Sequence, residues 1–402
     1  MSQPTPRLVY TEKRGNLFTL TPTEGQGRQL TWSWKDQGQS SAASGVSAQS
    51  TQLWPAWAPD GSRVAYFEIQ GTEGTAIVTS LYVVTSDGVE SWELANLPGE
   101  MPIYGNWSPR GDAFAMLVQR GEHHLALEVA SLARPGATTS LVTGAPLFWS
   151  WSPRGDLLAV HIGGSRRAAA DARVLLLDAH AGQIVREVSD RPGEFRVPSW
   201  SPNDDLIAYV ETTEENQNTL VLFDVSTGEK GRIATTSGSI ATVWSADGRF
   251  LAFGCTSRPG SSVFSLVKIV DLESGRITPL LDRPIASFFW FPQGDALLAL
   301  DMDDQHQHLR WRRVARRDGE TTELARFVPS REQTFIFSFF DQYAFSHPPL
   351  APDGSALAFA GFLIGAASPS TPTDSQIYIL PLDRTAEPRS IAAGNFACWT
   401  LA

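Results

Sequence analysis

The chain has 402 residues, of which 42% are hydrophobic and 19% are charged, and its formal net charge at pH 7 is −11. An acidic chain with only 32 lysines and arginines is poorly suited to nonspecific binding of nucleic acid or of an anionic membrane surface. No run of 18 apolar residues occurs, so the sequence predicts no transmembrane helix and no membrane insertion.

One short phrase recurs along nearly the whole chain, as in Trp107-Ser-Pro-Arg-Gly and Trp151-Ser-Pro-Arg-Gly. Its anchor positions are Trp57, Trp107, Trp151, Trp200, Trp244, Trp290, Leu350 and Trp399. The spacings between anchors are 50, 44, 49, 44, 46, 60 and 49 residues. A period of this size, with four short apolar runs per repeat, predicts an all-β propeller of four-stranded blades.

The two ends of the chain predict how the ring is closed. Residues 8–31 supply a second, third and fourth strand with no anchor strand before them, and residues 396–401 supply an anchor strand with nothing after it. Pairing the two would complete one blade and cover both exposed strand edges. The sequence therefore predicts a single domain, 1–402, closed by its terminal strands.

We expect eight blades, with seven as the alternative because the 60-residue spacing could conceal a misread blade. Blade 1 combines 8–31 with 396–401, and the other blades span 54–98, 104–143, 148–189, 197–235, 241–282, 286–328 and 346–392. In each repeat the anchor strand leads into a tight turn, in which proline presets one turn position and glycine takes another without steric cost. The anchor tryptophan is expected to fill the space between neighbouring blades.

The phrase resembles the WD40-like repeat of TolB-type propellers, which also occurs in the propeller domains of prolyl oligopeptidase and dipeptidyl peptidase relatives. The resemblance covers nearly the whole chain and implies the fold more specifically than the function, because one fold hosts many activities. Two departures stand out. The extra N-terminal α/β domain of TolB and the hydrolase domain of the peptidases have no counterpart in this sequence.

The second-to-third-strand loops and the blade-to-blade crossovers share one face of a propeller, and binding residues are often carried by long loops on a rigid scaffold. Within the anomalous spacing, residues 334–349 hold six aromatic residues together with Asp341, Gln342 and His347. One interpretation is a strand over 335–340 followed by a buried crossover. The other is an aromatic pocket wall on the top face, in which Asp341, Gln342, Tyr343 and His347 contact a ligand or partner.

Two further clusters have more than one interpretation. Asp303, His306 and His308 are weak candidates for metal ligands, because they lack a recognised ligand spacing and equally suit a polar loop. Five arginines surround Trp311, namely Arg310, Arg312, Arg313, Arg316 and Arg317. With Arg166 and Arg167 they could bind an acidic partner, or they could form an ordinary charged strand face.

No Gly-x-Ser-x-Gly elbow, phosphate-binding loop or dinucleotide fingerprint occurs. The favoured hypothesis is a non-enzymatic propeller without a cofactor, monomeric, that binds a protein or peptide by its top-face loops and channel mouth. The alternatives are a small-molecule or carbohydrate binder, or an unrecognised hydrolase or lyase, using channel residues, and an accessory to a separately encoded peptidase or transport component. The N-terminus lacks the features of a signal peptide and predicts a cytoplasmic protein. A removed presequence would instead place it outside the cytoplasm.

Overall fold

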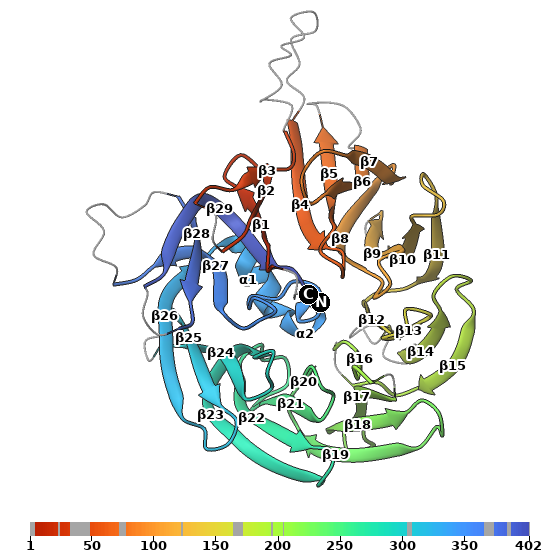
Figure 1. Cartoon of the computed structure of the whole chain (residues 1–402). Helices are drawn as coiled ribbons and strands as arrows, with labels where there is room; N and C mark the ends of the chain where they lie inside the picture. Colours follow the sequence, from red (N-terminus) through yellow and green to blue (C-terminus); the bar gives the residue numbers. More distant parts are fainter. Residues whose placement is uncertain are drawn as a thin grey trace, which may run out of the picture.

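The computed structural model describes residues 5–22, 25–32, 49–71, 78–121, 124–163, 172–193, 196–203, 205–303, 308–365, 374–383 and 387–401. Its sheets are arranged around a common centre (Figure 1). The predicted class is therefore confirmed: the fold is a β-propeller built almost wholly of antiparallel strands. None of the helices in these ranges is long and apolar enough to cross a membrane.

Four sheets are separate and have four strands each, and their first strands lie nearest the centre (Figure 1). The first is β4 (Gln49–Trp57), β5 (Arg63–Gly71), β6 (Val78–Thr85) and β7 (Ser91–Asn96), and the second is β8 (Glu100–Trp107), β9 (Ala113–Arg120), β10 (His124–Ser131) and β11 (Thr138–Thr143). The third is β12 (Leu147–Trp151), β13 (Leu157–Ile162), β14 (Arg173–Asp178) and β15 (Ile184–Ser189), and the fourth is β16 (Ser199–Trp200), β17 (Leu206–Thr212), β18 (Asn218–Asp224) and β19 (Lys230–Thr236).

The other strands form one continuous thirteen-stranded sheet. In chain order they are β1 (Leu8–Glu12), β2 (Leu17–Leu20), β3 (Arg28–Gln29), β20 (Ile240–Trp244), β21 (Phe250–Thr256), β22 (Phe264–Asp271), β23 (Arg276–Trp290), β24 (Ala296–Met302), β25 (Leu309–Ala315), β26 (Thr321–Pro329), β27 (Ala356–Leu363), β28 (Gln376–Pro381) and β29 (Arg389–Trp399). The sheet is continuous because β23, β26 and β29 each pair with one neighbour through their first part and another through their last part.

The terminal strands pair with each other. β1 lies antiparallel to the end of β29, with Leu8 opposite Trp399 and Val9 opposite Cys398. β1 also pairs with β2, which pairs with β3, so the strands within 8–31 occupy the order expected from the sequence.

The repeated phrase forms the turn between the first two strands of a repeat. In the copy that begins at Trp107, Gly111 has a φ of +67° and donates its N–H to the Ser108 carbonyl at 2.9 Å. Glycine is required there because a side chain would strain this left-handed conformation. The Trp107 indole donates to the Ala56 carbonyl of the preceding sheet at 3.0 Å, and Trp107 itself is 5% exposed. Trp107 therefore fastens two neighbouring sheets as well as filling the space between them.

The predicted strand over 335–340 is wrong. These residues belong to two short helices, α1 (Arg331–Ser338) and α2 (Phe340–Tyr343). Ser330 begins α1 as its N-cap, because its hydroxyl accepts the Gln333 N–H at 3.0 Å. Phe335, Phe337 and Phe339 alternate as they would in a strand, but the buried residues of the segment follow a helical face instead.

Candidate functional site

The two helices lie in the centre of the ring (Figure 1). We call residues 330–349 the channel segment. It begins beside β27, where the Ser330 N–H bonds the Ala360 carbonyl at 3.0 Å, and it ends where the Pro349 carbonyl accepts the Ala358 N–H at 2.8 Å. The segment thus crosses the centre from the loop face, which carries the second-to-third-strand loops and crossovers, to the turn face, which carries the repeated turns.

Aromatic contacts fix the channel segment to strands on several sides of the ring. The Phe340 ring lies 4.7 Å from that of Phe288 on β23, and the Phe337 ring lies 5.3 Å from that of Trp311 on β25. On the opposite side, the Tyr343 ring stands edge-on to Tyr104 of β8 at 4.5 Å. Edge-to-face pairs of this kind are favourable beyond the area that they bury.

Gln342 bonds the backbone of the innermost strand of the third sheet. Its amide nitrogen donates to the Trp149 carbonyl at 2.8 Å, and its amide oxygen accepts the Trp149 N–H at 3.3 Å. The backbone carbonyl of Gln342 accepts the Tyr104 hydroxyl at 3.1 Å. The Gln342 side chain thereby satisfies both the N–H and the carbonyl of Trp149, which lie on a buried strand edge.

Asp341 is 4% exposed and faces Arg196, with 3.4 Å between Oδ1 and Nη1. Burial raises the pKa of the Asp341 carboxyl group, and the Arg196 guanidinium opposes part of the rise. Asp341 and Gln342 both line a pocket of about 270 Å³ whose other walls include Trp107, Trp200 and the exposed ring of Phe345. That pocket opens on the turn face, whereas the sequence placed these residues on the opposite, top face.

Tyr343 and His347 are 2% and 3% exposed, so both lie inside the ring. His347 Nδ1 lies 2.8 Å from the Ser346 hydroxyl, and burial lowers the pKa of His347 to about 3. The imidazole is therefore neutral at pH 7. Burial also raises the pKa of the Tyr343 phenol well above its usual value. The structure brings the four predicted residues together, within the packing that fills the centre.

The other predicted positions are scattered. Asp303 bonds His308 across 2.8 Å, and His306, Arg166 and Arg167 lie outside the described residues. In the part of the chain that the structure describes, no three acidic, histidine or cysteine side chains are grouped so as to hold a metal ion. In the arginine cluster, Trp311 is fully buried. Asp301 forms ion pairs with both Arg310 and Arg312, at 2.9 and 2.7 Å.

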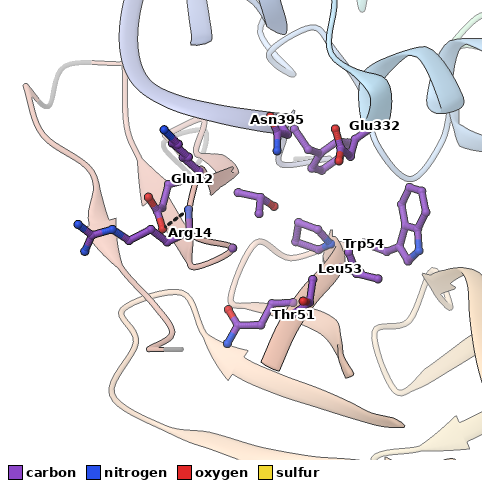
Figure 2. A pocket seen from close by; sticks show the side chains of 13 residues that line it. Glu12, Arg14, Thr51, Leu53, Trp54, Glu332 and Asn395 are labelled. Atoms are coloured by element: carbon purple, nitrogen blue, oxygen red, sulfur yellow. Dashed lines mark hydrogen bonds between the residues drawn. The ribbon is translucent and has the colours of Figure 1, made fainter. Parts of the chain in front are cut away.

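A pocket of about 230 Å³ opens on the loop face beside the start of α1 (Figure 2). The β1–β2 turn, the first part of β4, α1 and β29 all contribute to it. Its lining residues are Thr11, Glu12, Lys13, Arg14, Gly15, Thr51, Gln52, Leu53, Trp54, Pro55, Glu332, Asn395 and Phe396. In Figure 2 Glu332 and Asn395 are seen on one wall, while Arg14 points away from them.

Backbone strain marks this loop-face pocket. Trp54 has a φ of +54°, a conformation that bulky residues rarely adopt, and it lies where the pairing of β4 with β5 shifts register between Leu53 and Ala56. Its indole packs against the Phe335 ring of α1 at 5.2 Å. Sparsely populated backbone conformations cluster at ligand sites and switch regions. The sequence offered no signal for this pocket, because its walls come from distant segments and one of them follows from a bulge.

No family model matches the chain, and no curated protein matches it. Solved structures with the same fold share little sequence. A eukaryotic initiation factor is 13% identical, with a TM-score of 0.54 over 98% of both chains. A puromycin-hydrolysing peptidase from Mycobacterium tuberculosis is 16% identical, with a TM-score of 0.51 over 86% of this chain and 54% of its own. TolB from Acinetobacter baumannii is 14% identical, with a TM-score of 0.43 over 84% of this chain and 83% of its own. The first two similarities support the fold alone, which proteins of different functions share.

Proposed function

We propose that this chain is a non-enzymatic, TolB-like propeller that binds a protein or peptide at the loop-face mouth of its channel. The observation that carries the proposal is the loop-face pocket beside α1. The channel segment fills the centre, so a partner has to be recognised at a mouth. At this mouth Glu12 and Glu332 line the same pocket as Trp54, a mixture of polar and aromatic groups typical of recognition sites.

The geometry at Trp54 favours a peptide over a small metabolite. Because β4 changes register there, Trp54 and Pro55 have no Cα partner in β5. An irregular strand beside an open pocket offers backbone groups to which an extended segment can bond. Lys13 is held by Asp374, across 2.7 Å, and Arg14 points away from Glu332 and Asn395 (Figure 2).

The same proposal includes the finer features of the ring. We propose that the continuous sheet comprises four blades that share long strands, which gives eight blades with the four separate sheets. The pairing of β1 with β29 would close the ring. Because closure covers both exposed strand edges, we propose that the protein is a monomer. We also propose that the protein acts in the cytoplasm.

Site-specific photo-crosslinking tests the proposal. p-Benzoylphenylalanine replaces Thr51, an exposed residue of the pocket rim, and Arg110, an exposed residue of a turn-face loop, serves as the matched control position. In the native cell, we expect one defined protein to be crosslinked at position 51, and the product to disappear when Glu332→Lys is added.

Equal crosslinking at positions 51 and 110 would contradict the loop-face assignment. A complete lack of protein products at position 51 would overturn the scaffold function. Ligand screening by thermal shift would then decide for the small-molecule alternative.

A further inference from the structure

A separate pocket of about 250 Å³ lies on the turn face at the outer part of the ring. Strands β22 and β23 form one side, and the residues after β25 form the other. It is lined by Phe250, Ile269, Asp271, Arg276, Thr278, Arg316 and Arg317. Three of these seven residues are arginines, and two of them belong to the cluster around Trp311 that the sequence singled out.

One of the arginines is held rigidly. The Arg316 guanidinium lies 4.0 Å from the centre of the Phe250 ring, and its Nε donates to the Gly294 carbonyl at 2.9 Å. Arg249 approaches the same ring at 5.1 Å. Cation–π stacking and a backbone bond together fix the plane of the Arg316 guanidinium, so that an incoming ligand has less disorder to remove.

The charges around the pocket are not balanced. The one acidic residue in its lining, Asp271, shares Arg249 with Glu273, at 3.3 and 2.8 Å from Nη2. Within the described residues, no carboxylate forms an ion pair with Arg276, Arg316 or Arg317. Arg310 and Arg312 of the same cluster, by contrast, both bind Asp301. Three like charges that face one pocket repel one another, and an anion between them would relieve that repulsion.

We propose that this pocket binds the phosphate group of a phosphomonoester. Guanidinium groups match the oxygen geometry of phosphate with paired N–H donors, and the Thr278 hydroxyl adds a further donor at the wall. The volume admits a phosphate group and part of the group that it esterifies. The site is independent of the loop-face pocket, so it stands or falls separately from the proposed protein-binding function.

Titration calorimetry with inorganic phosphate, phenyl phosphate and a Gly-phosphoserine-Gly peptide tests the assignment at low ionic strength. We expect both esters to bind, and the double variant Arg276→Gln, Arg317→Gln to weaken binding at least tenfold. The matched control is Arg110→Gln, Arg389→Gln, which removes the same charge from two exposed arginines elsewhere. It should leave the affinity for the esters unchanged.

The remaining outcomes are decisive as well. Tighter binding of phenyl phosphate than of the peptide would indicate a small phosphoester as the source, and the reverse order would indicate a phosphorylated chain. An equal loss of ester affinity in the two double variants would mean that only the net charge of the protein matters, and it would overturn the site. Failure of both esters to bind at concentrations up to about 10 mM, an affinity too weak for a built site, would also overturn it.

Discussion

Gln342 takes the place of a strand partner for Trp149. The innermost strands of the ring have one edge that no neighbouring strand covers, and a buried N–H or carbonyl without a partner costs about 1–3 kcal/mol. One amide side chain from α2 meets both requirements at 2.8 and 3.3 Å. The polar side chain of Gln342 is thus explained by the backbone groups that surround it.

His347 predicts a pH dependence of stability. Its pKa is about 3 in the folded protein and about 6.5 in an unfolded chain. Between these values the unfolded state binds a proton that the folded state does not, so stability falls as the pH is lowered from 6.5 towards 3. From pH 7 to pH 5 the free energy of unfolding should fall by about 2 kcal/mol because of this residue. His347→Gln should remove this part of the pH dependence, which is measured as the difference in the free energy of unfolding between pH 7 and pH 5 by urea denaturation.

The exposed His180 provides the control. His180→Gln should show the same change in the free energy of unfolding between pH 7 and pH 5 as the parent protein. If His347→Gln also shows it, the buried neutral imidazole is not the source of the pH dependence, whatever the variant does to stability at pH 7. Asp341 acts in the opposite direction, because its pKa is raised, and it is present in all three proteins.

At the scale of elements, α1 shows where sequence patterns fail. The alternation of Phe335, Phe337 and Phe339 is compatible with a strand, and nothing local excludes one. The helix forms because Ser330 caps it and because Ile336, Phe337 and Phe340 then face the packed centre. Those contacts come from strands far away in the chain, and tertiary packing of this kind routinely overrides local propensity.

The N-cap of α1 can be tested directly. Ser330→Ala removes the acceptor for the Gln333 N–H and the donor to the Asn395 carbonyl. We expect a loss of about 1–2 kcal/mol in the free energy of unfolding. Ser338→Ala, at an exposed position in the last turn of the same helix, should change stability by less than about 0.5 kcal/mol. Similar urea midpoints for the two variants would show that the cap does not hold the helix.

For the whole molecule, the ring was predictable because its signal is local and repeated. Each anchor, such as Trp107 or Trp244, belongs to a turn phrase made of a few neighbouring residues that recurs at a regular spacing. The loop-face pocket was not predictable, because Glu12, Trp54, Glu332 and Asn395 meet only after the ring has formed. The role of Asp341 and Gln342 was likewise hidden, since the partners Arg196 and Trp149 are more than 140 residues away in the sequence.

The pairing of the terminal strands can be captured with one new cysteine. Val9 and Cys398 are Cα partners, and antiparallel partners lie within the Cα distance that a disulfide requires. Val9→Cys should therefore form a disulfide with Cys398 under oxidising conditions. The oxidised form should be more stable than the reduced form, by up to about 5 kcal/mol, with a higher Tm that dithiothreitol reverses.

The control for this crosslink is the double variant Val9→Cys, Cys398→Ser, which should show no change in Tm between oxidising and reducing conditions. Gel mobility without reductant reports the bond itself. A Val9→Cys protein that stays folded and keeps all three thiols free under oxidising conditions, with Cys255 as the third, would mean that β1 and β29 are not neighbours in this register.

The channel segment also sets an order of events during synthesis. A ribosome delivers β4 to β25 before it delivers residue 330, so the inner surfaces of those strands emerge while nothing fills the space between them. The residues of the channel segment that contact Tyr104, Trp149 and Phe288 in the folded protein are translated later than these three residues. The inner ends of these strands therefore cannot reach their final packing before residues 330–349 have been translated.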